Sequence, residues 1–142
     1  MSGMTQFVVA KRGDEKAISN HGWPIEKWVG CDGFKFFGAD ELGHLYAAVL
    51  GGSETYEHFP ILLQGDTGWI HEVPTALVSA LAEADDGTLA AFANGWSVGL
   101  AEGLRKKYQA DQLLGLLRDI RQVAAEAHRL GQPVFVWHSL AC

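Results

Sequence analysis

The last third of the chain carries the pattern that most restricts the fold, a long amphipathic segment followed at once by an apolar run. One face of residues 111–130 is apolar at helical spacing and consists of Leu113, Leu116, Leu117, Ile120, Val123, Ala124, Ala127 and Leu130. This face predicts a helix about 30 Å long, and Gly131 and Pro133 are typical of its end. Residues 134–140 are apolar at both alternating sets of positions as far as His138, which predicts a final strand buried on both faces. We interpret His138 as a hydrogen-bonded core residue.

Shorter apolar runs predict the rest of the core. Runs that indicate strands occur at residues 6–10, 61–63 and 69–73. Stripes at helical spacing occur at 40–50, 75–81 and 85–96, and a further helix is expected after Pro24. Strands and helices do not alternate regularly. We therefore expect an α+β fold, a small mixed or antiparallel sheet with helices packed against it and a long C-terminal helix before the final strand.

Polar residues and glycines indicate where these helices begin and where they weaken. The predicted N-caps are Asp40, Thr75 and either Asp85 or Asp86. Glycines recur every four residues at Gly95, Gly99 and Gly103. In a membrane that spacing indicates close contact between helices. In this short segment we interpret it as a weakened or broken helix, because each glycine costs ~1 kcal/mol relative to alanine.

Length and cysteine usage favour one intracellular domain. The chain has 142 residues, and we expect 1–142 to form a single globular unit. The first residues have neither the apolar core nor the cleavage site of a signal peptide, so we expect a cytoplasmic protein with Cys31 and Cys142 reduced. The uncharged stretch 88–101 spans 14 residues, fewer than the ~20 that cross a bilayer, and no membrane association is predicted.

Residues 36–104 contain no lysine or arginine. Their ten acids are Asp40, Glu41, Glu54, Glu57, Asp66, Glu72, Glu83, Asp85, Asp86 and Glu102. With a net charge of −6, such a surface repels phosphate backbones, so nucleic-acid binding is not predicted. Our leading hypothesis is a non-enzymatic binding protein whose acidic face docks on a basic protein partner, as a protein that neutralises a toxin would. The alternative is a solvated acidic surface that bases elsewhere, such as residues 105–107, partly neutralise.

The sequence lacks several common catalytic motifs. It lacks the Gly-x-x-x-x-Gly-Lys phosphate loop, the Cys-x-x-Cys pair, the His-Glu-x-x-His pair and the Gly-x-Ser-x-Gly elbow. We therefore predict no cofactor and favour a protein that is not an enzyme. A homo-oligomer is compatible with the sequence.

One metal-like pattern lies at the start of the segment 40–50, where Glu41 and His44 follow Asp40. Glutamate and histidine three residues apart share a helix face, as in carboxylate-bridged metal sites. Those sites need the motif on two helices, and this chain has it once. His44 also lies away from the apolar stripe, so we interpret it as facing solvent and predict no metal ion. Asp40, Glu41 and His44 stay candidate binding residues, and a metal at Glu41 and His44 stays one version of an alternative function as a small enzyme or ligand binder.

A second candidate site is the stretch that contains His21, Trp23, Trp28, Cys31 and Asp32. Its mixture of aromatic and polar groups is typical of ligand pockets, and it supports the alternative function of a small enzyme or ligand binder. A cysteine thiol becomes a nucleophile if a neighbouring histidine lowers its pKa. The competing interpretation, which we favour, is a buried cysteine beside structural tryptophans.

The order of elements resembles that of known proteins. The segments that carry the resemblance are residues 24–28 leading to Gly51-Gly52, residues 73–78 running into Asp85-Asp86, and residues 125–133 before the final strand. Over residues 23–140 the chain resembles small bacterial proteins of unknown function and, more distantly, the YfbM-like family. The resemblance implies an α+β fold and a bacterial cytoplasmic origin, and it supplies no catalytic residue. The strand at 6–10 and the aromatic cluster at 34–37 depart from the YfbM-like pattern.

Overall fold

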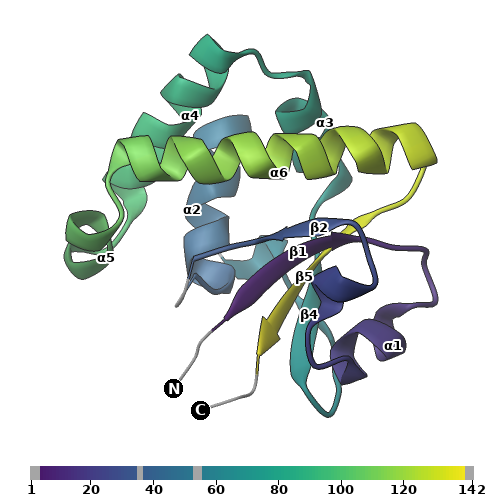
Figure 1. Ribbon diagram of the computed structural model, residues 1–142. Helices are drawn as coiled ribbons and strands as arrows, with labels where there is room; N and C mark the ends of the chain where they lie inside the picture. The colour runs from purple at the N-terminus through teal and green to yellow at the C-terminus, as the bar shows by residue number, and fades with distance from the viewer. Residues whose placement is uncertain (1–3, 35–36, 53–55, 140–142) are drawn as a thin grey trace.

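The computed structural model describes residues 4–34, 37–52 and 56–139, and within these ranges the chain forms an antiparallel sheet of five strands. In chain order the strands are β1 (Thr5–Val9), β2 (Gly30–Asp32), β3 (Ile61–Gln64), β4 (Gly68–Glu72) and β5 (Val134–Ser139). They lie in the order β2-β1-β5-β4-β3, so the first and last strands of the chain pair at the centre (Figure 1). This arrangement confirms the predicted α+β class and selects an antiparallel sheet.

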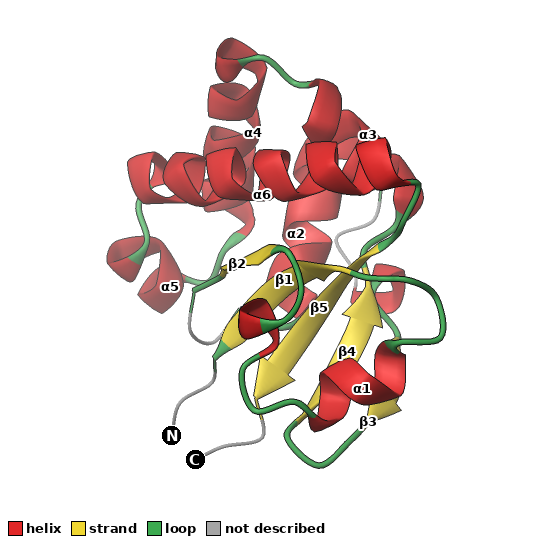
Figure 2. Ribbon diagram, turned by 45° about the vertical axis from the view of Figure 1, so that its right-hand side comes forward, coloured by secondary structure: helices red, strands yellow, loops and turns green. Residues whose placement is uncertain are grey.

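Helices cover both faces of the sheet. Those in the described ranges are α1 (Glu15–Asn20), α2 (Ala39–Leu50), α3 (Thr75–Glu83), α4 (Asp86–Gly99), α5 (Glu102–Lys107) and α6 (Ala110–Leu130), with short 3-10 turns at Pro24–Glu26 and Tyr56–His58. In Figure 2, α1 lies in front of the sheet. Buried residues of α2, α3, α4 and α6 pack in one cluster with side chains of the opposite face of the sheet. We call this opposite face the helix-covered face. None of these helices is long and apolar enough to cross a membrane.

The sheet contributes to a hydrophobic cluster on each side. Phe7 and Val136 belong to the larger cluster, on the helix-covered face. Val8 and Phe135 belong to the smaller cluster beneath α1, because successive side chains of a strand point to opposite faces. Residues 134–137 of β5 are at most 2% exposed, which confirms the prediction of a central strand buried on both faces.

Helix α6 buries the face that the sequence predicted. Its buried residues are Leu113, Leu116, Leu117, Ile120, Val123, Ala124 and Ala127. Leu130, the last residue of the predicted stripe, is 43% exposed because it lies at the end of the helix beyond the core. Gly131 then takes a left-handed conformation with φ of 65°, which glycine adopts more readily than other residues and which ends the helix.

The segment after Pro24 differs from the prediction of a longer helix. The chain makes one 3-10 turn there and then pairs with β1 as the edge strand β2. Gly30 permits this pairing, because a Cβ atom at that position would lie 2.1 Å from the Phe7 carbonyl oxygen. The close approach of two backbones therefore takes precedence over local helical spacing.

Two of the predicted helix caps are wrong by one or two residues. Gly38 rather than Asp40 is the N-cap of α2, and Pro74 rather than Thr75 is the N-cap of α3. Asp40 lies within the first turn, where its charge favours the helix dipole. The prediction for α4 is confirmed, because the Asp85 carboxylate accepts a backbone N–H from the first turn at 2.7 Å.

The glycine repeat coincides with a helix break and with a contact surface. Helix α4 continues through Gly95 and ends at Gly99, and α5 begins at Glu102, so the predicted break occurs at the second glycine. A Cβ atom added at Gly95 would lie 3.3 Å from Ala48 Cβ, and one added at Gly99 would lie 3.1 Å from the His44 ring. The missing side chains at Gly95 and Gly99 therefore also let α2 and α4 pack closely.

Two glycine substitutions test this account of the backbone. Gly30→Ala should lower the free energy of unfolding by about 1–3 kcal/mol, because the new methyl group would overlap the Phe7 carbonyl. Gly115→Ala, within α6 and with no neighbouring atom in the way, should raise it by about 0.5–1 kcal/mol through helix propensity. Urea unfolding followed by circular dichroism measures both values. An unchanged stability of Gly30→Ala would contradict the described β1–β2 register.

Candidate functional site

A hollow of about 400 Å³ lies at one end of the helix-covered face of the sheet. It is lined by Gly38, Ala39, Phe59, Pro60, Ile61, Trp69, His71 and His138, and we call it the histidine pocket. Strands β4 and β5 contribute the three ring-bearing residues Trp69, His71 and His138. The start of α2 and the segment that leads into β3 contribute the others. Apart from the two histidines, the lining is apolar or aromatic.

Strand register brings the two histidines together. In the antiparallel pair of β4 and β5, Trp69 lies opposite His138 and His71 lies opposite Val136. Because side chains alternate between the faces of a strand, His71 and His138 point to the same face as diagonal neighbours. Their ring centroids are 4.9 Å apart and the ring planes meet at 76°, an edge-to-face contact.

Thr5 of β1 determines the tautomer of His138. The buried Thr5 hydroxyl donates its hydrogen to the Phe37 carbonyl oxygen at 3.3 Å. Its oxygen, 3.2 Å from His138 Nδ1, must then accept a hydrogen from that nitrogen. We therefore assign the ring hydrogen to Nδ1, and Nε2 carries a lone pair. Within the described part of the chain, no group hydrogen-bonds to His138 Nε2.

The His71 ring lies beside the segment before β3, whose Pro60 and Phe59 backbone groups act to raise the pKa of the ring. No described residue is a hydrogen-bond partner for His71 Nδ1. His71 is 2% exposed and His138 is 6% exposed. Each therefore has a buried ring nitrogen without a partner among the described residues.

Burial keeps both histidines neutral at physiological pH. It lowers the pKa of His138 to about 3, with a smaller effect from the nearby His71. Burial also lowers the pKa of His71, and the nearby backbone groups of Pro60 and Phe59 partly oppose that shift. A general base works best when its pKa is near the working pH. The pair is therefore suited to forming hydrogen bonds with a bound molecule and poorly suited to proton transfer.

The structure divides the stretch that the sequence indicated as a pocket. His21 and Trp28 are in edge-to-face contact, with ring centroids 5.7 Å apart, and the Trp23 backbone N–H donates to His21 Nδ1 at 3.0 Å. Trp28 packs against the cluster beneath α1, and Asp32 accepts a hydrogen bond from β1 on that side of the sheet. Cys31 points to the helix-covered face, beside α6. Cys31 therefore does not share a hollow with His21 or Trp28.

The environment of Cys31 keeps its thiol protonated. Burial raises the pKa of this thiol to about 12, and the negative charges of Asp119 and Asp32 add to the shift. A hollow of about 450 Å³ lies beside Cys31, between β2 and α6. Since the thiolate is the reactive form of cysteine, this hollow has no nucleophile at neutral pH.

The metal-like residues of α2 have other roles. The Glu41 carboxylate accepts the Gly38 backbone N–H at 2.7 Å. His44 is half-buried against Gly99, so the prediction that it faces solvent was wrong, because α4 covers that side of α2. Asp40 is exposed in the first turn of the helix. In the ranges that the structure describes, no three His, Cys, Asp or Glu side chains are grouped to hold a metal ion.

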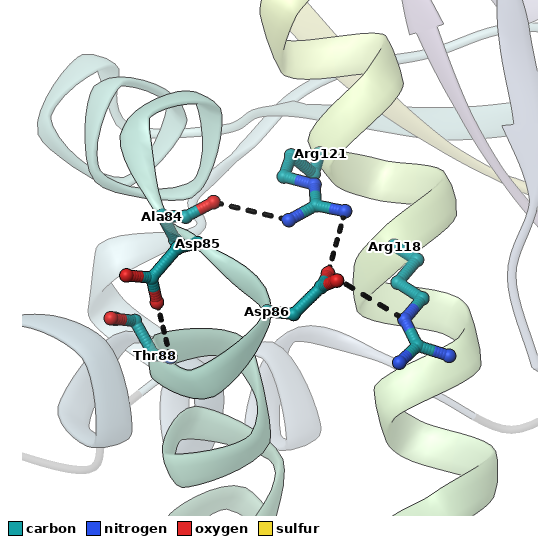
Figure 3. A network of polar contacts seen from close by, with 6 residues as sticks. All are labelled: Ala84, Asp85, Asp86, Thr88, Arg118 and Arg121. Atoms are coloured by element: carbon teal, nitrogen blue, oxygen red, sulfur yellow. Dashed lines mark hydrogen bonds and ion pairs between the residues drawn. The ribbon is translucent and has the colours of Figure 1, made fainter.

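Bases from outside residues 36–104 pair with acids inside that segment. Figure 3 shows Asp86 between Arg118 and Arg121 of α6, with N–O distances of 3.9 and 3.0 Å. Arg121 also donates to the Ala84 carbonyl oxygen at 3.1 Å and so joins the α3–α4 turn to α6. Asp85 lies beside them as the cap of α4. Two of the ten acids therefore have local structural roles at this turn.

Other acids of this segment are paired or dispersed. Further ion pairs are Arg12–Glu72 and Lys106–Glu102. Asp40, Asp66 and Glu83 lie on α2, on the β3–β4 turn and at the end of α3. The β3–β4 turn is at the bottom of Figure 1 and the end of α3 is near its top. This distribution does not favour one continuous acidic face, and the docking of a basic partner stays a prediction.

Most residues of the histidine pocket are not among the candidates that the sequence indicates. His138 was predicted only as a core residue, and His71, Trp69 and Thr5 were not predicted as site residues. The available signal was a histidine at an apolar position of two separate predicted strands. Which strands pair, and in which register, depends on contacts between residues far apart in the chain, so spacing along one strand does not show it.

Comparisons with known proteins do not extend this description. No protein-family model matches the chain, and neither a curated protein nor a solved structure shows significant similarity to it. The resemblance to the YfbM-like family therefore stays a prediction.

Thiol labelling tests the environment of Cys31. In a Cys142→Ser variant at about pH 7, the folded protein should react with Ellman's reagent at least ~100-fold more slowly than the same protein in urea, because its thiolate is scarce and half-buried. Absorbance of the released thiolate measures both rates. Comparable rates in the folded and unfolded protein would show that Cys31 is accessible and reactive.

Acid should destabilise the protein through His138. The pKa of His138 is about 3 in the folded state against an ordinary value of 6.5, so at intermediate pH the unfolded chain binds the additional proton. The stability that depends on neutral His138 is therefore present above about pH 6.5 and is lost as the pH falls toward about 3. Urea unfolding at several pH values should show a loss of a few kcal/mol in wild type. The loss should be smaller in His138→Phe, and equal losses would contradict the prediction.

Proposed function

We propose that the protein binds a small, mostly apolar molecule in the histidine pocket, with His138 Nε2 as a hydrogen-bond acceptor and His71 Nδ1 as a second hydrogen-bonding group. The observation that carries this proposal is that both nitrogens are buried without a partner among the described residues. A buried polar group left unpaired costs about 1–3 kcal/mol. A molecule that hydrogen-bonds to these nitrogens recovers part of that cost and gains affinity.

Among the described residues, buried polar side chains with unpaired atoms are confined to this pocket. In the described part of the chain, the other buried polar side chains are Thr5, Gln6 and Ser19. Gln6 donates to Asp32 and accepts from the Ile25 backbone N–H, at 3.1 Å in each case. Ser19 donates to a backbone carbonyl within α1, and Thr5 bonds as described above. Since the fold satisfies polar groups elsewhere in its core, the two unpaired nitrogens indicate a site for an external partner.

The shape and lining of the pocket support the same conclusion. Small-molecule sites are hollows of about 300–1,000 Å³ with mostly apolar walls and a few convergent polar groups. The histidine pocket has a volume of about 400 Å³, and its two polar side chains are adjacent. Ile61, at its edge on β3, is 62% exposed, which gives an entering apolar molecule a surface to contact.

The other sequence-based hypotheses have less support. A basic protein partner rests on charge composition, and the described acids are largely paired or dispersed. A cytoplasmic location in a bacterium rests on the first residues, the cysteine count and the resemblance. These stay predictions, and ligand binding at the histidine pocket is the function that the geometry supports best.

Blocking the pocket tests the proposal. A library of neutral aromatic fragments is screened by saturation-transfer NMR against wild type, Ala39→Phe and Ala91→Phe. Ala39 lines the pocket, whereas Ala91 is exposed on α4 and serves as a matched control. Fragments should bind wild type and Ala91→Phe, and binding to Ala39→Phe should weaken at least ~10-fold because the new ring fills the hollow. The proposal fails if no fragment binds, or if the hits bind Ala39→Phe equally well.

A further inference from the structure

We infer that the ligand of the histidine pocket is a neutral aromatic molecule with N–H or O–H donors at the edge of its ring. This inference rests on the proposed function and specifies the class of ligand. Three features of the pocket carry it: the direction of its hydrogen bonds, its lack of charge, and its aromatic lining.

The direction of hydrogen bonding follows from the tautomer of His138. Thr5 donates to the Phe37 carbonyl and accepts the only ring hydrogen of neutral His138. His138 Nε2 is therefore a buried acceptor without a partner among the described residues. A ketone, ester or ether presents only acceptor lone pairs and gains nothing from this nitrogen. A molecule with an N–H or O–H group satisfies it.

The lack of charge restricts the ligand further. None of the residues that line the pocket is a lysine, arginine, aspartate or glutamate. The two histidines are neutral at physiological pH, since burial lowers the pKa of each. A carboxylate, phosphate or ammonium group would lose its hydration here without gaining an opposite charge. The chemistry therefore favours a ligand without net charge.

The aromatic lining favours a flat ring. Trp69 is half-buried, and its ring centroid lies 6.0 Å from that of His138. Phe59 contributes a third ring type to the lining. Aromatic pairs contribute about 0.5–1.5 kcal/mol beyond the area they bury when they stack with an offset or meet edge to face. A planar ligand contacts several of these faces while its edge reaches the nitrogens.

A divalent metal ion is the competing occupant. His138 has one nitrogen hydrogen-bonded to Thr5 and the other without a described partner, which is also the arrangement of metal-ligating histidines. Zinc sites in proteins, however, use three or four protein ligands. The described residues supply two here, and no third metal-binding side chain is grouped with them. The donor-bearing aromatic molecule therefore fits the pocket better.

A pair of isomers tests the hydrogen-bond direction. 3-Methylindole and 1-methylindole have the same size and the same atoms, but only the first keeps its N–H donor. NMR titration of the full-length protein should give a Kd for 3-methylindole that is roughly tenfold or more below that for 1-methylindole, since only one of them pairs a buried acceptor. Histidine ¹⁵N spectra should show a shift of His71 Nδ1 or His138 Nε2 with 3-methylindole.

Histidine variants provide the control. His71→Phe and His138→Phe keep a ring in place and remove both unpaired nitrogens, so together they should bring the ratio of the two Kd values close to one. If the double variant fails to fold by circular dichroism, the wild-type ¹⁵N shifts still decide the question.

Each alternative outcome is distinguishable. Equal affinity for both isomers, with binding weakened by Ala39→Phe, would overturn the donor inference and leave the proposed function standing. Failure of all fragments to bind would contradict both the proposed function and the inference about the class of ligand. Binding of ZnCl₂ that requires both histidines and displaces 3-methylindole would assign the pocket to a metal ion and overturn the inference.

Discussion

The pairing of β1 with β5 is the interaction on which the rest of the structure depends. It joins residues 5–9 to residues 134–138 at the centre of the sheet. Closing a loop of nearly the whole chain costs conformational entropy, and burial of apolar side chains on both faces of β5 offsets that cost. Because β5 is central, one face must be covered by α1 and the other by the helices that include α6.

The same pairing creates the candidate site. Thr5 stands opposite His138 across the β1–β5 pair, and Trp69 stands opposite it across the β4–β5 pair. One end of an otherwise apolar sheet face thus acquires polar groups whose hydrogen bonds are only partly satisfied within the protein. Sequences tend to depart from the rules of core composition where function requires it. The low exposure of His71 and His138 makes this departure costly, which is the reason to assign it to ligand binding.

The sequence-based expectations agree with the structure where a feature depends on residues close together in the chain. They fail where it depends on residues far apart in the chain. The helix over 111–130 and the cap at Asp85 were predicted, because both depend on residues a few positions apart. The helix expected after Pro24 is replaced by an edge strand, since pairing with β1 outweighs local spacing. Gly95 was interpreted as a weak point and instead contacts Ala48, a residue distant in sequence.

The sequence by itself determined the α+β class, the long helix before a central strand and the burial of that strand on both faces, because periodicity is a property of neighbouring residues. Only the tertiary structure decided that His71 lies beside His138, that α4 covers His44 and that Arg121 pairs with Asp86. Each of these contacts depends on strand register or helix packing between distant segments. Spacing along one segment carries no information about the partner it meets.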